Sequence, residues 1–310
     1  MTFQFKSAAS FTERAGLFVS LTGSTNSGKT FSGLRLSRGI AGPDGKLAVL
    51  DTEGGRTLHL RDEFKFDANV MDPPFRPHRF AEAAKDAEDA GYACLLIDSF
   101  SMEWAGLGGV LDWQGEEIQR MAGDDYRKQE RMKMASWIKP KSAHKAMVYS
   151  FLQRRIPIIF SIRGEESVKP GEPGEKPQKI FKPICNSAFP YEVTLSFRLA
   201  ADRKGYIDLS DPKSWKMEGA HQAIFKDGDR ISEQHGAALA EWARGGSAPP
   251  TQPDTDDTPP LIVEGNMAAE RGREAFAAFW NRLTKDQRQS VGGVAQRDRW
   301  LAQVTEEQPA

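Results

Sequence analysis

Along residues 17–163, short apolar runs alternate with longer segments in which apolar positions recur at helical spacing. The apolar runs, which have the composition of β-strands, occupy 17–22, 45–55, 92–100 and 156–163. The helical segments occupy 29–42, 77–91 and 141–155. Strands that alternate with helices predict an α/β fold with a mostly parallel, doubly wound sheet. The run at 92–100 is apolar enough to be buried on both faces, as central parallel strands are.

Two segments interrupt this alternation. Residues 101–140 mix helical patterning with glycine and contain Trp104, Trp113 and Trp137, which predicts a helical insertion over the sheet. Tryptophans in such an insertion more often pack in a core or a lid than stack on nucleic-acid bases. Residues 164–183 are rich in Pro, Gly and charged residues, and this composition predicts a mobile loop.

The pattern after residue 190 is typical of hairpins. We expect one hairpin at 191–210 and a second at 221–232, which would turn at an Asp-Gly pair. A helix at 236–243 then ends a domain of residues 1–245.

A linker and a helical tail follow this domain. Residues 246–262 have the Pro-rich, acidic composition of a disordered linker, and residues 263–310 form a predicted helical segment. One apolar stripe of the tail consists of Phe276, Phe279, Trp280 and Leu283. Such a stripe must be buried. Burial against the protein's own core and burial against a partner protein both remain open.

Composition narrows the functional classes. The chain has 310 residues, 39% hydrophobic and 27% charged, with a formal net charge of −1, so no whole-molecule field favours nucleic acid or membrane. No apolar run approaches the length of a bilayer span. Cys94 and Cys185 form no C-x-x-C pair. The simplest interpretation is a reducing, cytoplasmic environment in which Cys94 is a small buried apolar residue.

The first strand leads directly into a match to the motif G-x-x-x-x-G-K-[ST]. The predicted nucleotide-binding residues are Gly23, Ser24, Thr25, Asn26, Ser27, Gly28, Lys29 and Thr30. In such a loop the glycines let the backbone approach the phosphates, while N–H groups and the N-terminus of the next helix attract the anion. Lys29 is expected to reach the β- and γ-phosphates, and the Thr30 hydroxyl to coordinate Mg²⁺. The order strand, loop, helix favours a phosphate loop over a Gly/Ser-rich turn.

Polar residues also follow the other strands. Asp98 ends an apolar strand, where an acidic side chain holds Mg²⁺ through water. Glu53 follows the second strand and is a candidate for polarising the water that attacks the γ-phosphate; the alternative is that Asp51 and Glu53 cap a turn. Ser161 and Arg163 at the fourth strand end are possible sensors of the γ-phosphate. Because the carboxyl ends of parallel strands meet at one edge, these groups are expected to converge in one crevice.

Positive charge concentrates between Arg127 and Lys182, with fourteen Lys and Arg against five Asp and Glu. Basic loops above a nucleotide site could follow a phosphate backbone, and Phe181, between Lys179 and Lys182, could stack on a base. A solvated surface balanced by acidic charge elsewhere explains the same excess. The sequence leaves the two interpretations open.

In order, the segments GSTNSGKT, VLDTEGG, LLIDSF and IIFSIRGEE resemble the RecA-like branch of P-loop ATPases, and more narrowly the phage-encoded AAA-family ATP-binding proteins of recombination and single-strand annealing. The resemblance covers about residues 15–245 in the order of motifs. The chain departs from RecA in having Ser161-Ile162-Arg163 in place of an Asn-Gln pair at the fourth strand end.

The resemblance implies ATP as substrate and Mg²⁺ as cofactor. It implies that Glu53 activates water, together with Lys29 at the phosphates, and that Asp98 is associated with the magnesium. It also implies single-stranded DNA binding through 101–140 and 164–183, and assembly of copies into a ring or filament.

The resulting hypothesis is an Mg²⁺-dependent ATPase that acts on single-stranded DNA in phage recombination or replication, in the cytoplasm of a bacterial host. The main alternative is a nucleotide-gated protein-interaction module that binds no DNA and recruits a protein partner through 263–310. A small-molecule kinase on the same loop is a weaker third possibility, because no acceptor pocket motif is recognisable.

Overall fold

The computed structural model describes residues 5, 7, 16–169, 178–245, 260–270 and 272–303. The chain divides into two units, Met1–Thr251 and Gln252–Ala310. None of the helices in these described ranges has the length and apolar character needed to cross a membrane.

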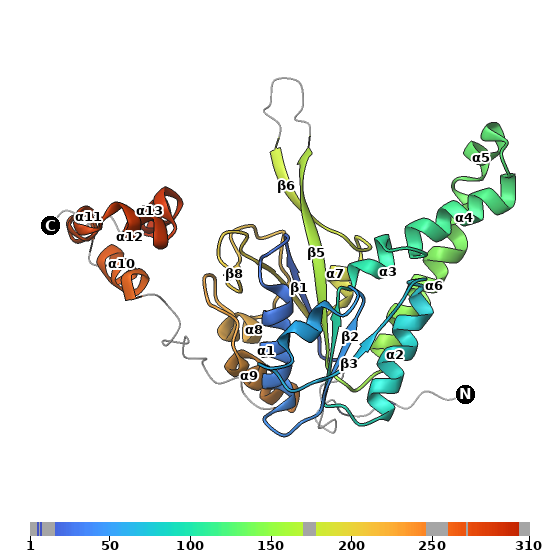
Figure 1. Cartoon of the computed structure of the whole chain (residues 1–310), viewed down its shortest axis with the longest axis horizontal. Coiled ribbons are helices and arrows are strands. Elements are labelled where there is room, and N and C mark those ends of the chain that lie inside the picture. Colours follow the sequence, from blue (N-terminus) through green and yellow to red (C-terminus); the bar gives the residue numbers. More distant parts are fainter. Residues whose placement is uncertain are drawn as a thin grey trace. The chain divides into compact units, whose positions relative to one another are not determined.

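The first unit is built on a mostly parallel sheet, with eight strands among the described residues, ordered β3-β2-β4-β5-β1-β7-β8 and with β6 paired to β5 (Figure 1). The strands are β1 (Phe18–Gly23), β2 (Leu47–Asp51), β3 (Asp67–Val70), β4 (Cys94–Asp98), β5 (Ile158–Lys169), β6 (Gln178–Pro183), β7 (Leu195–Leu199) and β8 (Ile207–Asp208). All neighbours from β3 to β7 run parallel, whereas β8 and β6 pair antiparallel with β7 and β5. This confirms the predicted α/β class and is compatible with a Rossmann-like or a RecA-like fold.

Helices cover both faces of the sheet and enclose two cores (Figure 1). One face is covered by α1 (Lys29–Ala41), η2 (Arg56–Leu60), α8 (Gly219–Ile224) and α9 (Glu233–Ala243), and the other by α2 (Pro77–Asp89), α6 (Ile138–Leu152) and α7 (Phe189–Glu192). Successive side chains of β4 point to opposite cores: Leu96 belongs to the first and Leu95 and Ile97 to the second. A strand buried on both faces needs the continuous apolar run that the sequence shows.

Two glycines let α1 and α9 approach closely. A Cβ on Gly39 would lie 2.0 Å from the carbonyl oxygen of Glu233, and one on Gly236 would lie 2.2 Å from that of Leu36. Gly39 therefore sits inside α1 as a packing residue, and the helix ends before Gly42, whose φ of 73° suits glycine.

The insertion predicted at 101–140 is helical, as expected, but part of it does not lie over the sheet. It contains α3 (Ser101–Ala105), α4 (Val110–Ala122), α5 (Tyr126–Met132), η3 (Ala135–Trp137) and the start of α6. It follows the carboxyl end of β4, and α4 and α5 extend away from the sheet (Figure 1). Trp104 and Trp137 stack on each other with ring centroids 6.2 Å apart, so they pack within the insertion.

The mobile loop predicted at 164–183 is wrong at both ends. β5 continues to Lys169 and pairs antiparallel with β6, and only 170–177 lie outside the described residues. The Pro and Gly residues that suggested a loop are concentrated in 170–177, and their density obscured the strand pattern on either side. Phe181 lies across Gly164, where a Cβ would meet its ring at 2.0 Å, so its ring is a packed group.

The hairpin predicted at 191–210 is confirmed in part, because β7 and β8 pair antiparallel, although β7 also joins β1. The hairpin predicted at 221–232 is wrong. Its first residues belong to α8, where His221 and Ile224 are spaced for one helical face and are both buried. The Asp-Gly turn is present, with Gly228 at φ 79°, but only an isolated bridge joins Arg230 to Tyr206.

The second unit has a core of its own. Its helices are α10 (Pro260–Glu270), α11 (Arg273–Arg282), α12 (Lys285–Ser290) and α13 (Gly293–Gln303). The stripe residues Phe276, Phe279 and Leu283 are buried in one cluster with Trp300, which is fully buried. The stripe is therefore buried within the tail. Of the linker predicted at 246–262, residues 246–259 lie outside the described residues, and α10 begins inside its end.

Candidate functional site

Residues 23–30 form a tight loop between β1 and α1. The Ser27 hydroxyl donates to the carbonyl oxygen of Ser24 at 3.0 Å, and Asn26 and Gly28 have left-handed φ values of 68° and 84°. A Cβ on Gly23 would lie 2.3 Å from the Ser27 hydroxyl oxygen. A side chain at position 23 would displace the Ser27 hydroxyl, and the left-handed φ at position 28 favours glycine there.

A distant loop supports this turn. The backbone N–H of Gly205 donates to the carbonyl of Ser27 at 2.9 Å, and a Cβ on Gly28 would lie 2.8 Å from the Gly205 nitrogen. No short-range pattern could have indicated this contact, because about 175 residues separate the two segments.

Lys29 opens α1, and its ammonium group folds back over the loop. Its Nζ donates to the carbonyl of Ser24 at 2.7 Å. Burial lowers the pKa of Lys29, the carboxylates of Asp98 and Glu53 oppose that shift, and the Arg163 guanidinium adds to it. Lys29 is thus a half-buried cation that lies close to two acidic side chains and to the N-terminus of a helix.

Thr30 lies in the first turn of α1, and Asp98 ends β4. In the sheet, β5 separates β4 from β1, the strand that leads into α1. The Thr30 hydroxyl donates to Asp98 Oδ2 at 2.6 Å. Burial raises the pKa of Asp98, the hydroxyls of Ser161 and Thr30 oppose the rise, and the charges of Glu53 and Asp51 add to it. The pair presents two oxygen donors at the carboxyl edge of the sheet.

Asp51 and Glu53 have different environments. Asp51 is fully buried and accepts hydrogen bonds from the backbone N–H groups of Glu53, Gly55 and Thr57 and from the Thr57 hydroxyl, at 2.6–3.1 Å. It therefore caps the turn after β2 and presents no free oxygen. Turn capping was the alternative role for both Asp51 and Glu53. The Asp51 carboxylate caps the turn, whereas the Glu53 carboxylate does not.

The Glu53 carboxylate is held by two arginines. Its Oε1 accepts from Arg163 Nε at 2.9 Å and lies 2.6 Å from Arg163 Nη2, while its Oε2 accepts from Arg56 Nη1 at 3.1 Å. Arg163 is on β5, opposite Gly23 of β1 in the register of the sheet. The ion pair joins the β2 turn to the strand that continues into the β5–β6 hairpin.

These groups share one open cleft of about 520 Å³. It is lined by Thr25, Asn26, Gly28, Lys29, Thr30, Phe31, Glu53, Arg56, Leu60, Asp98 and Arg163. The other predicted site residues do not line the cleft. Gly23, Ser24 and Ser27 belong to the loop itself, and Ser161 is buried next to Asp98. The fold thus brings four separate sequence segments to one place.

Three cleft residues were not predicted from the sequence. Phe31 and Leu60 give the cleft apolar groups, and Arg56 contributes a second cation. The spacing of Arg56, three residues after Glu53, was the available signal for their pairing. Phe31 packs edge-on against Phe64 at 5.1 Å, a contact that the sequence does not indicate.

The cleft suits a metal ion that prefers oxygen ligands and takes some of them from a bound molecule. Within the described ranges, no group of three or more His, Cys, Asp or Glu side chains could hold a metal ion. The Thr30 hydroxyl and the Asp98 carboxylate are hard oxygen donors. Mg²⁺ is usually bound by one or two such groups plus water and phosphate oxygens, so this donor set fits it.

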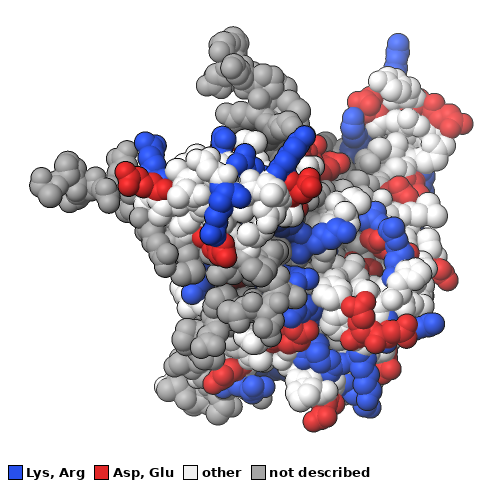
Figure 2. All heavy atoms as spheres, turned by 60° about the vertical axis from the view of Figure 1, so that its left-hand side comes forward, with Lys and Arg blue, Asp and Glu red and all other residues white. Residues whose placement is uncertain are grey.

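The two segments that the resemblance assigns to DNA both continue from strands at the cleft edge. Part of the positive charge there is paired, since Glu117 binds Arg120 and Lys139, and Glu130 lies 3.8 Å from Lys133. Acidic and basic side chains lie among one another on the face shown in Figure 2. Charge alone therefore does not mark a nucleic-acid site.

The chain matches none of the protein-family models compared with it, and the comparison with curated proteins finds no match either.

Proposed function

We propose that the chain binds ATP with Mg²⁺ in the cleft at residues 23–30 and hydrolyses it, as a RecA-like P-loop ATPase. The observation that carries this proposal is the 2.6 Å hydrogen bond between Thr30 and Asp98, formed in the same cleft as Lys29 and Glu53. A Gly/Ser-rich turn with no ligand would not need these four groups together.

Binding uses the start of α1. The loop amides and the N-terminal end of the helix attract the phosphates, and Lys29 Nζ exchanges the Ser24 carbonyl for phosphate oxygens. Thr30 and Asp98 hold the magnesium, which when bound neutralises charge on the β- and γ-phosphates. The half-burial of Lys29 strengthens its attraction to phosphate, because low local dielectric weakens screening.

Hydrolysis needs the Glu53 carboxylate to orient water in line with the γ-phosphate. In the structure both Glu53 oxygens are paired with arginines. We infer that Arg163 turns from Glu53 toward the γ-phosphate when ATP binds, since the phosphate carries more negative charge than one carboxylate. Arg163 then senses the phosphate and frees Glu53 for water.

Single-stranded DNA is the proposed polymer partner, in phage recombination or replication. Arg163 lies on the strand that extends into the β5–β6 hairpin, and the insertion at 101–140 follows the strand that ends in Asp98. Both segments are therefore joined directly to residues of the cleft. Through these two strands, ATP binding or hydrolysis in the cleft could change the conformation of both segments.

The alternative is a nucleotide-gated interaction module that hydrolyses ATP slowly. The paired Glu53 favours it, because a carboxylate neutralised by two cations polarises water poorly. The separately folded C-terminal unit is the candidate partner-binding part.

ATP turnover with and without single-stranded DNA, at low and high salt, separates the two. DNA stimulation that weakens with salt supports the ATPase on DNA. Slow turnover that DNA does not change supports the interaction module. Absence of ATP binding contradicts both.

A further inference from the structure

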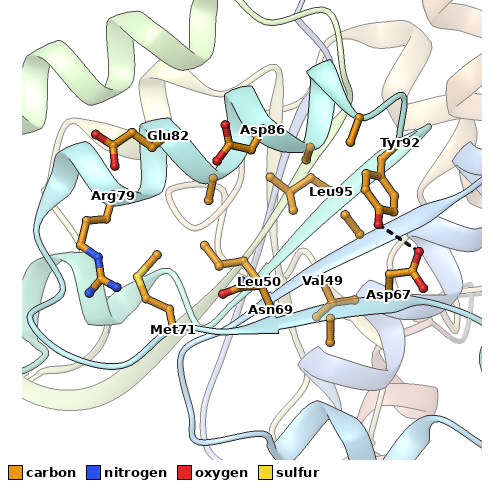
Figure 3. Close-up of a pocket in the computed structure, with 15 residues that line it drawn as sticks. Val49, Leu50, Asp67, Asn69, Met71, Arg79, Glu82, Asp86, Tyr92 and Leu95 are labelled. Atoms are coloured by element: carbon orange, nitrogen blue, oxygen red, sulfur yellow. Dashed lines mark hydrogen bonds between the residues drawn. The ribbon is translucent and has the colours of Figure 1, made fainter.

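A second cavity, which shares no lining residue with the nucleotide cleft, lies between α2 and the β3 edge of the sheet (Figure 3). Its volume is about 480 Å³, and we call it the α2–β3 groove. Leu50 and Leu95 lie on its floor, and Met71 and Ala83 add apolar surface. Residues of α2 line one side of the groove, and residues of β2, β3 and β4 line the other.

The groove opens at a free strand edge. β3 is the last strand of the sheet among the described residues, paired only with β2, and all four of its residues are exposed. No strand of the described residues pairs with its outer N–H and C=O groups, the groups through which another extended chain can add to a sheet edge. An added strand would place alternate side chains over the groove.

The rim of the groove is acidic. Glu82 and Asp86 stand along α2, and Asp67 stands on β3, where it accepts a hydrogen bond from the Tyr92 hydroxyl at 3.0 Å (Figure 3). The carboxylates of Glu82 and Asp86 form no ion pair with the described residues. The cation at the rim, Arg79, donates to backbone carbonyls of the loop after β3.

We propose that the α2–β3 groove binds an extended, cationic segment of a partner protein, which adds a strand to β3. A bulky apolar side chain lies on the floor at Leu50, and Lys or Arg two residues away on the same face meets Glu82 and Asp86. Edge pairing supplies affinity, and the apolar anchor and the acidic rim supply selectivity. This interaction is independent of the proposed ATPase activity.

The test uses the full chain and a fluorescein-labelled peptide, Lys-Thr-Phe-Thr-Lys-Thr, which places Phe and both Lys on one face of a strand. Two control peptides replace both Lys by Glu, or Phe by Ser. Fluorescence anisotropy without nucleotide should show salt-sensitive binding of the first peptide, and about tenfold weaker binding of each control. Hydrogen exchange should slow at residues 67–70 when the first peptide binds.

The variant Glu82→Lys/Asp86→Lys should weaken binding of the Lys peptide at least about tenfold, because repulsion replaces attraction. Asp89→Lys, on the same helix but outside the groove, is the matched control and should bind like the wild type. Ala83→Leu, which fills part of the groove without changing charge, should also weaken binding.

Equal binding of the three peptides, absence of binding, or unchanged binding by the double reversal would each overturn the proposal. Self-association of the wild-type chain, abolished by the double reversal, would identify a second copy as the occupant and also overturn it. Sedimentation velocity measures that outcome. If the double variant no longer unfolds cooperatively, Ala83→Leu takes its place in the comparison with the wild type.

Discussion

Arg163 of β5 and Glu53 of the β2 turn form an ion pair of 2.6 Å within the cleft that contains Lys29. The two residues are 110 positions apart in the chain, and the fold brings them together because β4, which pairs with β2, also pairs with β5. The pair connects the group proposed to orient water with the strand that leaves the cleft as a hairpin. We propose that Arg163 changes its partner from Glu53 to the γ-phosphate, and that this change links ATP binding to the β5–β6 hairpin.

Replacing Glu53 with Gln should preserve ATP binding and slow hydrolysis by about 100-fold or more, because a neutral amide cannot act as a base toward water. Single-turnover kinetics at saturating ATP measure the chemical step directly. Turnover equal to that of the wild type would reassign the role to another residue.

Replacing Arg163 with Ala should slow ATP turnover about tenfold and remove its response to single-stranded DNA, because the proposed sensor is lost. The matched control is Arg56→Ala, which removes the other ion pair of Glu53 from a side chain that is 73% exposed. That variant should change turnover by less than about threefold. If the two variants behave alike, Arg163 has no special role in coupling.

Replacing Asp51 with Ala should destabilise the first unit by about 2–3 kcal/mol, because it leaves several buried donors of the β2 turn without their acceptor. The thermal midpoint of that unit should fall, and residual ATP binding at low temperature should be retained. A variant as stable as the wild type would show that the turn does not depend on this carboxylate.

Replacing Asp98 with Asn should raise the thermal stability of the nucleotide-free protein at pH values where Asp98 is ionised, while weakening Mg²⁺-dependent ATP binding. Burial raises the pKa of Asp98, so folding favours its protonated form. This contribution is fully present below the ordinary value of 3.8 and is lost as the pH rises through the raised pKa. At pH values above that raised pKa, the wild type carries a buried charge that Asn lacks.

The stabilisation by Asn should therefore shrink as the pH falls, and disappear where Asp98 is protonated in both states. Thermal melts from pH 4 to pH 8 test this, with and without Mg²⁺. A stability gain that is constant over that range would show that charge burial is not its cause.

The sequence was sufficient to predict the alternation of strands and helices and the helical insertion at 101–140. These depend on local periodicity, which survives in a single sequence. It failed where tertiary contacts override local composition. β3 has the weak strand sequence Asp-Ala-Asn-Val and forms by pairing with β2, and the strand ends near 170–177 were obscured by neighbouring Pro and Gly.

The convergence of Lys29, Thr30, Glu53 and Asp98 was predicted from the rule that parallel strands end at one edge. The partners of Glu53 were not, because no short-range pattern relates it to Arg163. The support of the loop by Gly205 escaped prediction for the same reason.

Calorimetric titration with ATP and Mg²⁺ of the wild type and of Lys29→Ala shows whether the loop at residues 23–30 holds a nucleoside triphosphate. We expect saturable binding by the wild type at one site per chain, and loss of binding in the Lys29→Ala variant, which should melt like the wild type. Absence of binding by the wild type, or equal binding by both, would contradict this expectation.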